Sequence, residues 1–261
     1  MRFAVHDPLN GHIFGDSERL FLNTELGCAS SCSYCYLPIE NYPIGSRTLS
    51  RISAAQLLAA IEANAQIRRG RSGTLFSIGC FSECWDSRNW RETISLISGL
   101  LPLGNNIQVA TKRKISSHAL APLASLTGFK AQVHFYISSS TITQWRHYEK
   151  GTTPVLKRFE SFSVCKEFGI SVHLYIKPVL PNITIQDAEK YGDIMRSYGV
   201  SAIVGEQFES NDMGSLAPIS KKLVISEHAD VQQLRDILSQ YGEVFCNSTD
   251  TFVIGESASA C

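Results

Sequence analysis

Short β-rich runs alternate with segments of helical spacing along most of the 261-residue chain. Each β-rich run gathers β-branched and aromatic residues, and each intervening segment repeats apolar residues every three to four positions. The β-rich runs are residues 19–25, 74–79, 106–111, 132–138, 171–178 and 201–207, and the helical segments are residues 54–69, 90–101, 118–126, 154–168 and 186–198. Six strands that alternate with helices predict an α/β fold around a parallel sheet.

The two ends of the chain differ from this alternating region. A polar arm is expected over residues 1–18, one α/β domain over residues 19–210, and an extension over residues 211–261 that caps the domain. Within the extension we expect a helix at 229–240 and a last strand near 251–254. Periodicity alone does not decide whether the six strands curl into a partial barrel or lie as an open doubly wound sheet.

Composition excludes several classes of protein. The 24 Lys and Arg residues equal the 24 Asp and Glu residues, so no overall field indicates a nucleic acid or an anionic membrane as partner. No apolar stretch approaches the roughly 20 residues that span a bilayer, and residues 1–20 lack the apolar segment of a secretion signal. We therefore expect a cytoplasmic protein, in which eight cysteines serve as metal ligands or catalytic groups rather than as a disulfide framework.

Three cysteines lie together in the segment GCASSCSYCYLP, which directly follows the first predicted strand. Cys28, Cys32 and Cys35 have the spacing C-x3-C-x2-C and lie where β/α folds keep their chemistry, at the carboxyl edge of the sheet. Three thiolates can hold a 4Fe-4S cluster and leave one iron open to a small molecule. The alternatives are a zinc site completed by a remote fourth ligand and three unrelated core cysteines. The cluster is favoured because no second C-x2-C knuckle is present in the sequence.

The loop resembles the signature of the radical S-adenosylmethionine enzymes, in which an aromatic residue adjoins the last cysteine. Here Tyr34 and Tyr36 flank Cys35. The resemblance implies a partial TIM barrel of about six β-α units, a 4Fe-4S cluster on the three cysteines, and S-adenosylmethionine on the open iron. It also implies an electron donor such as flavodoxin or ferredoxin, and a 5'-deoxyadenosyl radical that abstracts hydrogen from a substrate.

Within that superfamily three segments are similar to spore photoproduct lyase and its relatives, namely CSYCYLP, SIGCFSECWDSRN and ATKRK. By this resemblance Cys80 matches a hydrogen-donating cysteine. Tyr36 is a candidate for an electron or hydrogen path and Tyr34 for packing against the cofactor; the alternative is that both tyrosines only shield the cluster. The remaining cofactor contacts implied by the resemblance are Ser82, Glu83, Lys112 and Ser138. The implied substrate is a thymine lesion in DNA, which would reach the active site by base flipping.

The chemical role of Cys80 can also be argued without the family resemblance. A thiol S–H bond is weaker than most C–H bonds, so a cysteine facing a radical pocket can quench a substrate radical; the alternative is packing at a strand end.

Cys84, Cys246 and Cys261 are candidate ligands of an auxiliary iron-sulfur site. Such a site would favour modification of a peptide or a small metabolite instead of DNA repair. A third hypothesis is a non-catalytic iron-sulfur or zinc protein. Cys165 is expected in the core.

Aromatic and basic residues near the strand ends are candidates for nucleic-acid contacts. An indole can stack on an extruded base, and core packing is its alternative role. Clustered cations can position a phosphate backbone, although a solvated helix end explains them as well. The residues concerned are Trp85, Trp90, Trp145 and the basic segments 68–71 and 111–114.

Overall fold

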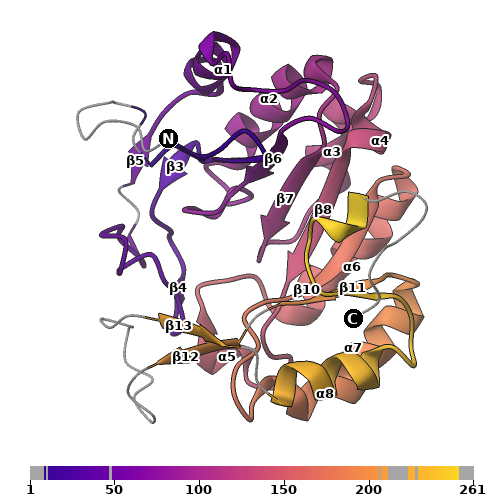
Figure 1. Cartoon of the computed structure of the whole chain (residues 1–261). Helices are drawn as coiled ribbons and strands as arrows, with labels where there is room; N and C mark the ends of the chain where they lie inside the picture. Colours follow the sequence, from indigo (N-terminus) through magenta and orange to yellow (C-terminus); the bar gives the residue numbers. More distant parts are fainter. Residues whose placement is uncertain are drawn as a thin grey trace.

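The main sheet of the computed structural model is an open, mostly parallel one of eight strands (Figure 1). The structure describes residues 9, 11–46, 49–205, 207–210, 223–226 and 229–252. In spatial order the strands are β1 (Ile13–Gly15), β2 (Arg19–Leu22), β6 (Leu75–Ile78), β7 (Ile107–Thr111), β8 (Val133–Ser138), β10 (Ser171–Ile176), β11 (Ala202–Val204) and β14 (Val244–Phe245). The spatial order follows the chain order without the reversal of a doubly wound sheet. The predicted partial barrel is therefore confirmed.

Helices follow most of the strands. In addition, three short strand pairs lie outside the main sheet. The helices are α1 (Ala54–Ala63), α2 (Trp90–Leu100), α3 (Ser117–Ala124), α4 (Phe129–Gln132), α5 (Trp145–Tyr148), α6 (Val155–Glu167), α7 (Ala188–Tyr198) and α8 (Ala229–Leu238). The strand pairs are β3 (Glu25–Leu26) with β5 (Ser50–Arg51), β4 (Ser31–Cys32) with β9 (Glu149–Lys150), and β12 (Gln207–Ser210) with β13 (Leu223–Ser226). Single 3-10 turns lie at Leu101–Leu103, Thr184–Asp187 and Asp250–Phe252.

Side chains alternate between the two faces of each strand, which separates an apolar core from a polar interior. In β8, Phe135 and Ile137 are fully buried in the large apolar cluster that the sheet shares with the helices. Tyr136, between them, packs in a separate small cluster with Ile203 and Phe245. The helices therefore cover one face of the sheet, and the other face is left to line an interior.

The helix boundaries follow local capping chemistry. Helix α1 begins after Ser53, whose hydroxyl and backbone form a capping box with Gln56. It ends at Asn64, which is extended and accepts a hydrogen bond from the Gln66 backbone with its side chain. The predicted extension of this helix to residue 69 is thus wrong, because the Asn64 turn competes with continued helix. Helix α7 ends as expected at Gly199, whose φ is +58°.

Both ends of the described chain add strands that the sequence analysis does not predict. Strand β1 pairs antiparallel with β2, and β14 pairs parallel with β11. The strand expected at 251–254 is wrong for residues 251 and 252, which belong to the 3-10 turn. This turn enters the sheet interior, because the Phe252 ring lies 4.0 Å from that of His134 and the Thr251 hydroxyl lies 2.6 Å from that of Tyr136. Residues 253 and 254 lie outside the described residues.

The division into arm, domain and extension at residues 18 and 210 stays a prediction. A search of the described residues for a helix long and apolar enough to cross a membrane found none.

Candidate active site

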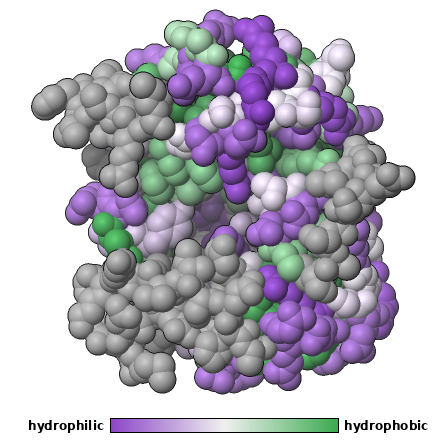
Figure 2. All heavy atoms as spheres, in the orientation of Figure 1, coloured by the Kyte–Doolittle hydropathy of each residue, from purple (hydrophilic) through white to green (hydrophobic). Residues whose placement is uncertain are grey.

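One cavity of about 780 Å³ combines the inner face of the sheet with the loops that follow its strands. Figure 2 shows the molecule hollowed near the centre of the face seen in Figure 1. The ten residues predicted from sequence to bind the cluster, to contact the cofactor or to transfer hydrogen all line this cavity, from four different strand ends. They are Cys28, Cys32, Tyr34, Cys35, Tyr36, Cys80, Ser82, Glu83, Lys112 and Ser138. The structure thus brings the ten together, whereas their individual chemical roles stay predictions.

The cysteine loop is shaped by a glycine and fixed by backbone pairing. Gly27 has a φ of +97°, and a Cβ there would lie 2.6 Å from the Pro43 carbonyl oxygen. A residue with a side chain is therefore strained at this turn. Further along, β4 places Cys32 opposite Glu149 of β9. The loop is consequently attached to a segment more than a hundred residues away.

The three thiols are largely withdrawn from water. Burial raises the pKa of Cys28 to about 11 and that of Cys32 to about 12, and it also raises the pKa of Cys35. Without a metal they are neutral thiols, and binding iron would release their protons. Among the residues that the structure describes, no three His, Cys, Asp or Glu side chains are grouped to hold a metal ion. A cubane cluster binds each cysteine through a different iron, so its thiolates do not converge on one point.

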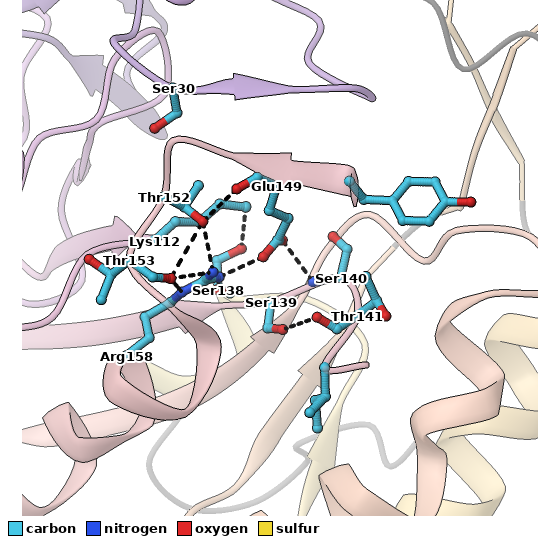
Figure 3. A network of polar contacts seen from close by, with 12 residues as sticks. Ser30, Lys112, Ser138, Ser139, Ser140, Thr141, Glu149, Thr152, Thr153 and Arg158 are labelled. Atoms are coloured by element: carbon cyan, nitrogen blue, oxygen red, sulfur yellow. Dashed lines mark hydrogen bonds and ion pairs between the residues drawn. The ribbon is translucent and has the colours of Figure 1, made fainter. Parts of the chain in front are cut away.

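A buried ion pair anchors the loop from below (Figure 3). Glu149 and Arg158 are both fully buried, and Nη1 of Arg158 lies 2.8 Å from Oε2 of Glu149. The other carboxylate oxygen accepts hydrogen bonds from the Tyr34 hydroxyl at 2.5 Å and from the Ser140 backbone N–H at 3.0 Å. Burial alone would raise the pKa of Glu149, but the Arg158 and Lys112 charges and these hydrogen bonds hold it below its ordinary value. Glu149 is therefore a carboxylate.

Arg158 extends this network to the neighbouring strand end. Its guanidinium donates to the carbonyl oxygens of Ser138 and Thr153 and to the Thr152 hydroxyl. The Ser138 hydroxyl accepts from Nζ of Lys112 at 2.7 Å. That ammonium also lies 5.6 Å from the centre of the Tyr34 ring. The contacts form a closed ring from Glu149 through Tyr34, Lys112, Ser138 and Arg158 back to Glu149, so these side chains have little freedom.

Ser82 and Glu83 differ in how they are bonded. Glu83 is 8% exposed and accepts hydrogen bonds from the Thr111 hydroxyl and from the backbone of Lys112 and Trp85. Its carboxylate therefore ties the end of β6 to the end of β7. The Ser82 hydroxyl is buried in the cavity wall and has no hydrogen-bond partner among the described residues. A buried hydroxyl without a partner is costly, so a polar ligand at this position would be stabilised.

Cys80 and Tyr36 lie next to each other in the cavity wall. The Tyr36 hydroxyl lies 3.3 Å from Sγ of Cys80 and donates to the Cys80 carbonyl oxygen. Gly79 precedes Cys80 with a φ of +90°, and a Cβ there would lie 2.8 Å from Sγ of Cys84. Burial raises the pKa of Cys80, so its sulfur carries hydrogen at neutral pH. The pair is thus a thiol and a phenol within hydrogen-bond distance.

The inner face of the sheet contributes polar residues that the sequence analysis missed. Arg19, Ser77, Gln108 and Tyr136 all line the cavity from β2, β6, β7 and β8. We call these four residues the polar floor. The signal in the sequence is the alternation in RLFL, where Arg19 shares a face with Phe21 while Leu20 and Leu22 are buried on the other face. An arginine at such a position indicates a polar interior.

The other cysteines occupy separate environments. Cys165 is fully buried in the core, as predicted. Cys84 is 1% exposed within the same apolar cluster, and its thiol donates to the Ala110 carbonyl oxygen. Cys246 lines the cavity and is disulfide-bonded, and Cys261 lies outside the described residues. A disulfide sulfur is not a thiolate ligand, and Cys84 is sealed in the apolar core, so the structure does not support the predicted auxiliary iron-sulfur site.

The candidate nucleic-acid contacts are partly used inside the protein. Trp85 is 4% exposed and packs edge-on against Phe135 at 5.3 Å, so core packing accounts for it. Trp90 and Trp145 are half-buried against the same core. In the basic segments, Arg113 pairs with Asp86, and Arg68 and Lys114 pair with Glu18 and Glu160.

Comparison with known proteins rests on structure. No protein-family model matches the chain, and no curated protein matches it in sequence. Spore photoproduct lyase matches with a TM-score of 0.59 and 12% identity over 84% of this chain and 72% of the lyase. Its complex with dinucleoside spore photoproduct gives a TM-score of 0.58 at 13% identity, over 84% of this chain and 71% of the lyase.

A second neighbour is SuiB from Streptococcus suis, solved with bound S-adenosylmethionine. Its TM-score is 0.60 at 14% identity, over 89% of this chain and 49% of SuiB, so the chain spans about half of that protein. Spore photoproduct lyase and SuiB are both radical S-adenosylmethionine enzymes. At these identities the likeness establishes the fold. The resemblance drawn from the cysteine loop is therefore confirmed at that level: this chain has the fold of the radical S-adenosylmethionine enzymes.

Proposed function

We propose that the chain is a radical S-adenosylmethionine enzyme with a 4Fe-4S cluster, and that its substrate is a thymine lesion in DNA. The observation that carries the proposal is one cavity with three thiols in one part of its wall and the Cys80–Tyr36 pair in another. When bound, the cluster and S-adenosylmethionine supply a 5'-deoxyadenosyl radical that removes hydrogen from the substrate. A structural neighbour complexed with a dinucleoside photoproduct supports the choice of substrate.

The residues of the chain fit this cofactor pair. Cys28, Cys32 and Cys35 would hold the cluster, since their loop is already fixed to β9. The Ser82 hydroxyl has no hydrogen-bond partner within the described ranges, and the Lys112 ammonium lies in the cavity wall, so a polar and partly anionic ligand is matched there. Ser138 orients Lys112 through their hydrogen bond.

Cys80 would return hydrogen to the substrate radical. Its S–H bond breaks homolytically, a C–H bond forms on the product, and the unpaired electron is left on sulfur. The Tyr36 hydroxyl, 3.3 Å from that sulfur, can then return a hydrogen atom to it. One electron and one proton, from a donor such as flavodoxin or ferredoxin and from solvent, restore the phenol.

Reconstitution tests the class of enzyme. The anaerobic protein, supplied with iron and sulfide, should bind about four irons per chain and release 5'-deoxyadenosine with S-adenosylmethionine and dithionite. The triple substitution of Cys28, Cys32 and Cys35 by Ala should lose the iron, whereas the core variant Cys165→Ala should keep it. Zinc in place of iron, or wild-type protein that never cleaves the cofactor, would sink the proposal.

Product analysis tests the substrate and the role of Cys80. With dinucleoside spore photoproduct, wild-type protein should yield the repaired thymidine pair. Cys80→Ala should still cleave the cofactor but divert the substrate radical to side products. An unchanged product distribution in this variant would remove Cys80 from the mechanism, and no turnover of the lesion by wild type would redirect the search to a peptide or a small metabolite.

A further inference from the structure

Arg19 lies in the cavity wall and is bonded to neutral side chains of the described residues. Its Nε donates to the Ser77 hydroxyl at 2.8 Å, and its Nη2 donates to Oε1 of Gln108 at 2.7 Å. The guanidinium carbon lies 4.6 Å from the centre of the Phe21 ring. Within the described ranges no acidic side chain pairs with Arg19, and its Nη1 has no hydrogen-bond partner. In the part of the chain that the structure describes, this partly buried cation therefore contacts neutral groups only.

The groups around Arg19 hold it in one orientation. Nε2 of Gln108 donates to the Ser248 carbonyl oxygen at 2.8 Å and to the Tyr136 hydroxyl at 3.3 Å. The opposite end of the same amide, Oε1, is thereby directed toward Arg19 and also accepts from the Ser77 hydroxyl at 3.1 Å. A guanidinium fixed along one edge presents its remaining N–H groups in a rigid fork, which suits a carboxylate or a phosphate.

The charges that line the cavity favour an anion at this position. Of the residues that the structure describes, three cationic side chains line it, Arg19, Lys112 and Lys177, against the carboxylates of Glu40 and Glu83. Glu83 is occupied by hydrogen bonds from the β7 end. Moving an anion into contact with an uncompensated, partly desolvated cation is favourable, whereas leaving the cation alone is costly.

Arg19 also lies near the proposed hydrogen donor. Burial raises the pKa of the Cys80 thiol, while the charges of Arg19 and Lys177 act to lower it and that of Glu40 to raise it. Ser77, which accepts from Nε of Arg19 at 2.8 Å, lies in β6, and Cys80 follows the end of that strand. Arg19 and Cys80 also line the same cavity, so a molecule held by the arginine would share that cavity with the thiol.

We propose that Arg19, set in the polar floor, binds an anionic group of the substrate, a carboxylate or a phosphate ester, and so positions the substrate beside Cys80. The positioning of a substrate radical rests on the proposed function. The anion site itself does not, because it is built from protein side chains alone.

The test uses the metal-free protein and two simple anions. Inorganic phosphate and, in a separate series, acetate are titrated into wild type, and binding is followed by the nitrogen-proton NMR signal of the arginine Nε groups. Arg19→Met should weaken binding of the preferred anion by at least about tenfold. Arg91→Met is the matched control, because Arg91 stacks on the Trp90 ring at 4.5 Å outside the cavity. Its binding should equal that of wild type.

Arg19→Lys guards against a variant that simply fails to fold, since it keeps the charge and loses the fork. It should retain weakened anion binding and a wild-type circular dichroism spectrum. Equal anion binding by Arg19→Met and wild type, or no binding to wild type of either anion, would overturn the proposal. A preference for phosphate over acetate would identify a phosphate ester as the group bound, and the reverse a carboxylate.

The two proposals fail separately. Wild-type protein that binds the anion but never cleaves S-adenosylmethionine would refute the proposed function and leave the anion site. Protein that cleaves the cofactor but binds no anion at Arg19 would refute the anion site and leave the proposed function.

Discussion

Two cations, Arg158 below the cysteine loop and Arg19 in the cavity wall, have different surroundings. Arg158 is fully buried and is paired with Glu149, which in turn holds Tyr34. In the polar floor, the hydrogen bonds of Arg19 to described residues all go to the neutral side chains of Ser77 and Gln108. A cation that is paired with a carboxylate of the protein is neutralised and serves to position its neighbours. A cation without such a partner can still bind an anionic ligand, so Arg158 belongs to a supporting network and Arg19 is a candidate binding group.

Breaking the Glu149–Arg158 pair should have the largest effect on stability. Arg158→Met leaves the Glu149 carboxylate buried without its cation, and removing one member of such a pair costs about 3–5 kcal/mol. The free energy of unfolding, measured by urea denaturation of the metal-free protein, should fall by that amount. The mobility of the cysteine loop should increase as well, because Tyr34 loses a fixed acceptor.

Lys157→Met is the matched control, since residue 157 precedes Arg158 in α6 and is exposed. Its unfolding free energy should stay within about 0.5 kcal/mol of wild type. An Arg158→Met protein as stable as this control would show that the pair has no supporting role, and the contrast between the two cations would be lost.

The second prediction concerns two buried histidines next to the polar floor. Nε2 of His173 lies 3.1 Å from Nδ1 of His134. Burial lowers the pKa of His134 to about 4 and that of His173 to about 3, with the nearby Arg71 acting on the former and His134 on the latter. The unfolded chain, with pKa values near 6.5, binds more protons below that pH. The stability that the two neutral histidines contribute to the folded protein is therefore complete above pH 6.5 and is lost as the pH falls toward 4.

Unfolding free energies at pH 7 and pH 5 measure this effect. Wild type should lose roughly 3–4 kcal/mol over this interval, a little under 2 kcal/mol for each ring. The double variant His134→Gln with His173→Gln removes both titrating rings and should lose clearly less. The exposed His147→Gln control should follow wild type. If the double variant has the wild-type slope, carboxylates elsewhere cause the acid sensitivity.

The sequence predicts what repeats locally and misses what is joined at a distance. The six parallel strands are recovered because period-two runs are local signals, and the cysteine loop because its spacing lies within eight residues. The contact from Tyr34 to Glu149 joins residues 115 positions apart, and that from Arg19 to Gln108 spans 89 positions. No local pattern encodes either partner. The turn at Asp250–Phe252 was predicted as a strand because its partners, Tyr136 and His134, are equally remote.

The smallest predicted effect tests whether the polar floor depends on its contact with the C-terminal turn. The Tyr136 hydroxyl bonds to the Thr251 hydroxyl and the Ser248 carbonyl oxygen, and it accepts from Gln108. Tyr136→Phe should reduce the unfolding free energy by about 1 kcal/mol, the usual net value of a buried hydrogen bond. Tyr198→Phe, a half-buried tyrosine, should change it little. Because Gln108 keeps its bond to Ser248, anion binding at Arg19 should decline only slightly in Tyr136→Phe. A complete loss would mean that the turn, and not Gln108, orients the arginine.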